Sequence, residues 1–155
     1  MPPKAGTETT YAIIFNVTNT TNRITDAKVT ASLPSYVRWI GIFSPNTEKI
    51  TFDQIQGTMT WDIGTIEPGV GLNGTPAKQA AIAIAFSPST SQIGQQPALL
   101  RSITLTGTDS ATKQTITQTT KTDITTNLLQ PARTSDTSSV GTDPGFSVTN
   151  ATVVK

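Results

Sequence analysis

The chain has 155 residues, with 11 Lys plus Arg against 10 Asp plus Glu, and charged residues make up only 14% of it. It contains no cysteine and no histidine, which excludes disulfides, zinc sites built on those residues and imidazole acid-base catalysis. The balanced, sparse charge argues against a nucleic-acid-binding surface. This length is enough for one domain with its own hydrophobic core.

Threonine is the most unusual feature of the composition, with 31 of the 155 residues, beside 11 Gly and 10 Pro. β-branched side chains favour strands because they lose little rotamer freedom on a pleated surface. The longest nearly continuous apolar run, residues 80–86, is far shorter than the ~20 residues of a membrane helix, so we expect no direct membrane insertion. The composition therefore predicts an all-β protein.

Alternating apolar and polar residues predict five strands in the first half of the chain. In the first, Tyr11, Ile13, Phe15 and Val17 share one face. The second ends at Pro34, which removes a donor from the ladder. The same alternation places Trp39 and Trp61 on the inward faces of later strands. The five segments are 11–18, 27–33, 37–43, 50–52 and 58–63.

The second half of the chain predicts two or three further strands. Residues 81–86 are apolar on both faces, which is typical of a central strand or of one that is partly covered. Residues 102–106 alternate, a hairpin connection follows at 109–113, and residues 115–128 return as a Thr-rich strand. Seven to eight strands, about ten residues apart, are typical of an antiparallel sandwich or barrel.

The amino-acid composition of the chain changes near Leu129. We expect a β-sandwich domain over residues 1–128 and a Ser/Thr/Pro-rich linker or tail over residues 129–155, too polar to offset the cost of ordering it. The few apolar residues in this tail predict either one short strand at 146–154 or a segment that leads into a following domain. These residues are Phe146, Val148, Val153 and Val154.

Several short motifs resemble one known family. They include Asn16-Val17-Thr18-Asn19-Thr20, the run from Ala31 to Trp39 that contains Leu33-Pro34, and Thr60-Trp61-Asp62-Ile63-Gly64. In this order the motifs resemble the prokaryotic surface-repeat family called domain of unknown function eleven, or conserved repeat domain, over about residues 2–128. The resemblance implies an immunoglobulin-like β-sandwich, repeated in long secreted or envelope-anchored proteins, and carries over no functional residues.

The chemistry-bearing side chains do not form a catalytic pattern. The ten carboxylates are scattered, with no adjacent pair and no calcium-loop spacing, so solvated turn positions account for them. Lys28 or Lys121 could form an isopeptide bond only if buried, and Lys28 lies on a polar phase. We therefore expect no enzyme activity, and we assign no catalytic, cofactor-binding or metal-binding residues and no cofactor.

The aromatic residues allow two interpretations. Trp39 and Trp61 could form a sugar-stacking platform, but their apolar phase favours the core, where a sandwich usually holds a buried Trp. Tyr36 lies outside the apolar phase and is the main exposed aromatic candidate. A carbohydrate-binding module would depend on it.

These observations favour a non-catalytic structural spacer or adhesion module of a prokaryotic cell-surface protein, with neighbouring repeat domains or surface polymers as partners. We expect it to be extracellular or at the cell surface, as part of a longer secreted protein. The alternatives are a carbohydrate-binding module and a subunit of a surface filament assembled by strand addition, in which residues 146–154 mediate self-association.

Overall fold

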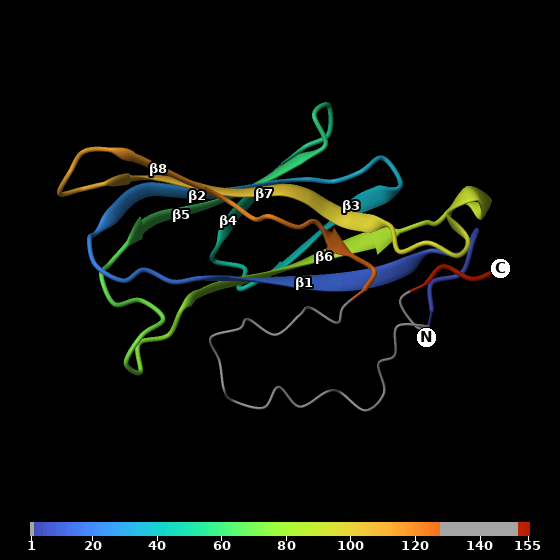
Figure 1. Ribbon diagram of the computed structural model, residues 1–155, viewed down its shortest axis with the longest axis horizontal. Helices are drawn as coiled ribbons and strands as arrows, with labels where there is room; N and C mark the ends of the chain where they lie inside the picture. The colour runs from blue at the N-terminus through green and yellow to red at the C-terminus, as the bar shows by residue number, and fades with distance from the viewer. Residues whose placement is uncertain (1, 128–151) are drawn as a thin grey trace.

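The computed structural model describes residues 2–127 and 152–155, which form two antiparallel β-sheets packed face to face (Figure 1). The all-β sandwich predicted from the sequence is confirmed. The one helical element in the described ranges is the 3-10 helix Thr90–Gln92. The strands are β1 (Thr9–Val17), β2 (Ile24–Ser32), β3 (Val37–Ser44), β4 (Lys49–Asp53), β5 (Thr58–Ile66), β6 (Lys78–Phe86), β7 (Ala98–Asp109), β8 (Thr115–Thr119) and β9 (Ile124–Thr125).

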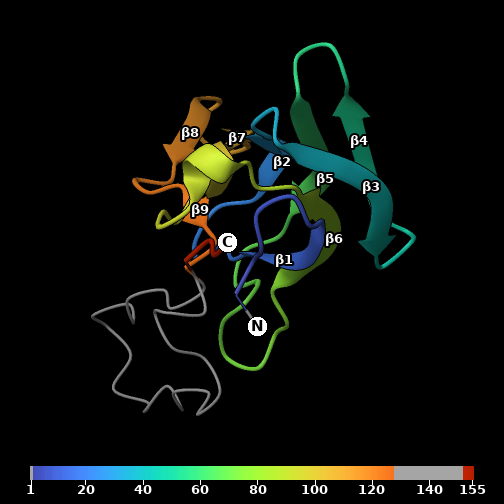
Figure 2. The same ribbon diagram turned by 90° about the vertical axis from the view of Figure 1, so that its right-hand side faces the viewer.

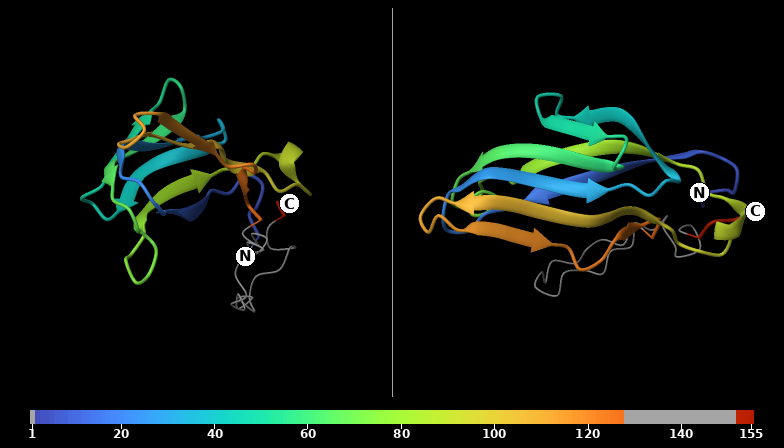
Figure 3. Two further views of the ribbon diagram at one scale, coloured as in Figure 1. Left: turned by 60° about the vertical axis from the view of Figure 1, so that its left-hand side comes forward. Right: turned by 90° about the horizontal axis from the view of Figure 1, so that it is seen from above.

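The two sheets differ in size. The smaller sheet has the order β1-β6-β3, and the larger has the order β4-β5-β2-β7-β8, with β9 paired to β7 beyond that path. The right panel of Figure 3 shows the larger sheet from above. The strand β6 is central in the smaller sheet, which explains why its sequence is apolar on both faces. One sheet therefore extends past the other.

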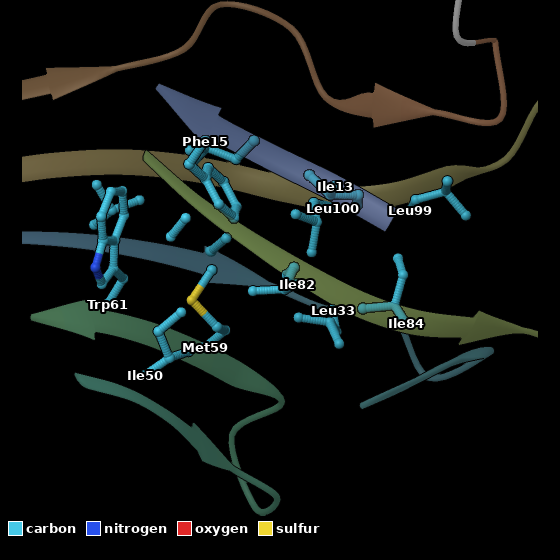
Figure 4. Packing of buried hydrophobic residues seen from close by; sticks show 14 of the residues in the cluster. Ile13, Phe15, Leu33, Ile50, Met59, Trp61, Ile82, Ile84, Leu99 and Leu100 are labelled. Atoms are coloured by element: carbon cyan, nitrogen blue, oxygen red, sulfur yellow. The ribbon is translucent and has the colours of Figure 1, made fainter. Parts of the chain in front are cut away.

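The core lies between the two sheets (Figure 4). Trp61 and Met59 of β5 and Phe86 of β6 are fully buried, and Ile82 and Ile84 of β6 join them. The alternation predicted for β1 is confirmed, since its inward residues from Ile13 to Val17 are buried while Ile14 is 58% exposed. Period-two burial across facing sheets thus forms a single hydrophobic cluster.

The predicted strand bounds differ most from the structure at β7 and at the Thr-rich return. The strand β7 begins at Ala98 rather than at Ser102, because Leu99 and Leu100 are both fully buried and a continuous apolar run hides the alternation. The Thr-rich return is not one strand but two, β8 and β9. Between them the backbone N–H of Thr120 donates to the carbonyl of Ile103 at 2.9 Å, and Asp123 leads into β9.

The two ends of the described chain lie together at one pole of the sandwich (Figure 1). Lys4 and Val154 form a parallel bridge, and Val153 is 1% exposed and belongs to the core cluster. Residues 128–151, which hold most of the expected tail and most of the expected strand at 146–154, lie outside the described residues. Val153 and Val154 of the expected tail therefore pack on the domain.

Candidate binding surface

Trp61 is a core residue, as its phase predicts. It is 0% exposed, its ring lies 6.3 Å from that of Phe15, and its indole N–H donates to Glu48 Oε2 at 2.8 Å. The carboxylate satisfies the one polar atom of the ring, which permits full burial. Trp61 therefore cannot serve as a platform for a sugar.

Trp39 is less buried than the sequence predicts. It lies on β3, an edge strand of the smaller sheet, and stacks on Phe52 of β4 with ring centroids 5.6 Å apart and planes 20° apart. The pairing of β3 with β6 shifts register between Trp39 and Phe43, where Gly41 has a φ of 83°. This bulge bends the edge and leaves Trp39 half-buried, because the alternation does not continue through it.

Tyr36 is not the freely exposed aromatic residue that the sequence predicts. Its ring packs edge-on against Phe86, with centroids 5.8 Å apart, and its hydroxyl accepts a hydrogen bond from Arg101 Nη2 at 3.4 Å. The ring therefore covers the end of the core and is half-buried. Little of its face is left for stacking on a ligand.

Among the residues that the structure describes, the charged side chains form no reactive cluster. Lys28 and Lys121 are both exposed, which confirms the solvated position predicted for Lys28. Within residues 2–127 and 152–155, no group of three or more Asp, Glu, His or Cys side chains is arranged to hold a metal ion. In the same ranges, no helix has the length and apolar character needed to cross a membrane.

The strongest candidate for a binding site is a cleft of about 400 Å³ between the two sheets, along β1. Residues 14–17 of β1 and the adjoining Thr18 form one wall, and residues of β7, β8, β9 and the segment between β8 and β9 form the other. Buried Phe15, Val17, Val29 and Ile103 contribute apolar lining, and Thr and Gln side chains supply the polar part. None of the described residues that line the cleft is charged, and the volume of the cleft is within the range of ligand sites.

The cleft exists because the sheets have unequal numbers of strands. The larger sheet continues beyond β7 to β8, whereas the smaller sheet ends at β1. One edge of β1 pairs with β6 from Thr9 to Val17 without a register shift, and no described strand pairs with its other edge. The backbone N–H and C=O groups of every second residue of β1 therefore point away from β6, toward the cleft.

Two polar contacts hold the far end of β1. The Asn19 side chain is buried, and its Nδ2 donates to the carbonyls of Asn22, Ile66 and Glu67 at 2.6, 3.2 and 3.2 Å. Its backbone N–H donates to the carbonyl of Val70 at 2.9 Å. Asn19 thus ties the end of β1 to the connection between β5 and β6.

Two ionisable groups have shifted pKa values. The hydrogen bond from Asn22 Nδ2 to Asp109 Oδ2, at 2.8 Å, and those from the backbone N–H groups of Thr112 and Ala111 lower the pKa of the Asp109 carboxyl. Partial burial raises the pKa of Tyr11. Both effects stabilise the charge state that each group has at neutral pH, so neither group is a tuned acid or base.

The cleft is not predicted by the sequence, although the sequence of β1 contains one signal of it. The run Thr9–Val17 contains no charged residue and no proline, the residues that natural edge strands use to prevent further pairing. The sequence alone did not show that this strand is an edge. The contact of Glu48 with Trp61 was also missed, because a turn carboxylate is expected to be solvated.

Comparisons with known proteins leave the family open. No family model matches the chain, and no curated protein matches it significantly. Among solved structures, the chain is similar to a DUF4466 family protein from Parabacteroides merdae, with 12% sequence identity and a TM-score of 0.25. The match covers 79% of this chain and 40% of that chain, so this chain spans less than half of that protein. The resemblance to the conserved repeat family stays a prediction.

Proposed function

We propose that this protein is a non-catalytic structural spacer or adhesion module of a prokaryotic cell-surface protein, with an immunoglobulin-like sandwich of the conserved-repeat type. In this proposal it lies outside the cell, between neighbouring repeat domains or against surface polymers. The low content of charged residues, 14%, the abundance of Thr and the scarcity of reactive side chains support a mechanical rather than a chemical role.

The observation that carries this proposal is the contact between the two ends of the chain. Val154 donates its N–H to the carbonyl of Pro3 and accepts from the N–H of Ala5, both at 2.9 Å, and the two segments run parallel. The first segment is residues 3–5 and the second is residues 153–155. A load that pulls on the N-terminal end of the first segment and on the C-terminal end of the second acts along both segments. The bonds are then sheared together rather than opened one after another.

The second segment also bonds to the loop before β7, on the side away from Pro3 and Ala5. Val153 donates to the carbonyl of Gln95 at 3.0 Å and accepts from Gly94 at 2.9 Å, while its side chain is buried in the core. A force on the last residues therefore has to break backbone bonds on two sides and expose an apolar side chain. This arrangement suits a domain that is loaded through its ends.

Single-molecule force spectroscopy with attachments at residues 1 and 155 tests the proposal. Val154→Pro removes the N–H that bonds Pro3, so we expect a lower unfolding force with little change in the thermal midpoint. Lys155→Pro, at the next and exposed residue, is the matched control and should unfold like the wild type. Equal forces for Val154→Pro and the wild type would overturn the mechanical role.

The carbohydrate-binding alternative has one observation in its favour, the half-buried Trp39 stacked on Phe52. A glycan array with wild type, Trp39→Ala and Tyr36→Phe tests it. Specific binding that Trp39→Ala abolishes and Tyr36→Phe retains would place this alternative above the spacer proposal. An array without signal would remove it.

A further inference from the structure

The edge strands of the two sheets are protected to different degrees. The edge β3 carries Arg38 and a bulge, and the edge β4 is short and carries Lys49 and Asp53. The edge β8 has only five residues. By contrast, β1 is a regular nine-residue edge without charge, proline or bulge. Such an edge is a template for pairing with another segment.

The cleft beside β1 follows the strand over residues 14–17 and has a volume of about 400 Å³. An incoming strand would bond to the edge of β1 with which no described strand pairs, and would place every second side chain over the apolar lining, the general form of β-strand addition. A whole domain presenting its own sheet edge would meet β8, which extends the larger sheet past β1. The geometry therefore favours one extended segment as the occupant.

We propose that this cleft accepts residues 145–151 of a second copy of the chain by strand addition. This inference is independent of the spacer proposal, and it specifies the edge that receives the self-associating segment predicted from the sequence. The segment reads Gly-Phe-Ser-Val-Thr-Asn-Ala, with apolar Phe146 and Val148 at alternate positions. Like the cleft, it is uncharged, and it lies outside the described residues.

The structure narrows the donor segment that the sequence suggests. Val153 and Val154 are bonded within their own chain, so the donor ends before them. Val148 is six residues from Val154 and reaches at most about 22 Å from it. Val17, at the far end of the cleft, lies about 27 Å beyond Thr9 along β1. In its own domain the segment is tethered at Val154, and only Gly145 and Phe146 can lie more than about 27 Å from that residue, whereas a segment from a second copy has no such tether.

Sedimentation velocity from micromolar to millimolar concentration tests the site with matched variants. We expect the wild type to associate, and Ile14→Lys to stay at the monomer mass of 16.4 kDa because it places a charge at the mouth of the cleft. Ile42→Lys is the control, because Ile42 is 64% exposed on the other edge of the same sheet, against 58% for Ile14. It should associate like the wild type.

A mixing experiment separates donor from acceptor. Ile14→Lys retains the donor segment and Phe146→Ser retains the cleft, so each variant alone should be monomeric while an equimolar mixture forms dimers. If Ile14→Lys lowers stability, Asn16→Lys at an exposed position of the same edge replaces it. A mixture that stays monomeric would overturn the donor assignment and would indicate that another segment fills the cleft.

A synthetic peptide of residues 144–151 gives a direct binding measurement. We expect saturable 1:1 binding to the Phe146→Ser protein and at least tenfold weaker binding when Ile14→Lys is added to that protein. A wild type that is monomeric throughout, together with no peptide binding, would overturn the proposal. So would Ile42→Lys abolishing association as fully as Ile14→Lys. Neither result would alter the force test of the spacer proposal.

Discussion

The two long sides of the sandwich are built differently, and Figure 2 shows β3 lying beside β4 on one of them. On one side, β3 of the smaller sheet meets β4 of the larger sheet, and the stacked rings of Trp39 and Phe52 bridge them. On the other side, β1 and β8 leave a cleft of about 400 Å³. Both sides are built from strands with the same alternating pattern, so the pattern fixes what faces inward but does not close an edge.

The difference follows from strand number. The three-stranded sheet is aligned with the larger sheet at the side where β3 meets β4. On the other side the larger sheet extends past β1, so β8 has no strand of the smaller sheet facing it. Aromatic side chains fill the aligned side, where edge strands of the two sheets meet. The overhanging side keeps a polar rim of Thr and Gln around an apolar lining. The closed side should therefore dominate stability, and the open side should be available for binding.

The largest expected effect is at the centre of the core. Trp61→Ala removes a fully buried ring and leaves Glu48 without its donor, so we expect a loss of ~3–5 kcal/mol in the free energy of unfolding. Urea denaturation followed by circular dichroism measures it. Ile14→Ala, on the open side and 58% exposed, is the comparison and should change stability by less than ~1 kcal/mol. Similar losses of unfolding free energy for Trp61→Ala and Ile14→Ala would contradict the expected difference between the core and the open side.

The next effect concerns the end of β1. Asn19→Ala leaves carbonyls of the connection after β5 without their donor, and we expect a loss of ~1–3 kcal/mol. Asn16→Ala, at an exposed position of the same strand, should stay within about 0.5 kcal/mol of the wild type. Equal denaturation midpoints for Asn19→Ala and the wild type would show that the open side does not depend on this contact.

The stacked pair that bridges the closed side should give a smaller coupling. A double-mutant cycle of Trp39→Ala and Phe52→Ala isolates the interaction from the area that each ring buries. We expect a coupling of ~0.5–1.5 kcal/mol for rings in this geometry. Strictly additive losses would mean that the rings are neighbours without closing the side of the sandwich.

The smallest effect is a pH dependence at the hairpin between β7 and β8. The pKa of Asp109 is lowered in the folded state, so its ionised carboxylate stabilises the fold above the ordinary value of 3.8. This contribution is lost as the pH falls through the lower folded value. The stability difference between wild type and Asp109→Asn should therefore shrink on acidification. A stability difference that grows at acidic pH would contradict a lowered pKa for Asp109.

Much of the fold follows from local patterns in the sequence. The alternation from Tyr11 to Val17 and around Trp61 identifies strands and their buried faces, because period-two burial is a property of the strand itself. Three features depend on neighbours far away in the chain and were not predictable. These are the edge position of β1, the bulge that leaves Trp39 half-buried, and the packing of Tyr36 on Phe86.

The candidate site illustrates the same division. The uncharged sequence of β1 is visible in the chain, but its meaning depends on the number of strands in each sheet. The parallel contact of Lys4 with Val154 joins the two ends of the sequence, and no local pattern indicates it. Both functional proposals therefore rest on long-range arrangement rather than on a motif.

The most direct test of the open side is amide hydrogen exchange by NMR on Phe146→Ser at low concentration, where strand donation is removed. The account predicts strong protection along β6, which pairs on both edges, and an alternating pattern along β1, with every second amide exchanging much faster. Uniform protection of all β1 amides, equal to that of β6, would show that the edge is already occupied and would contradict the account.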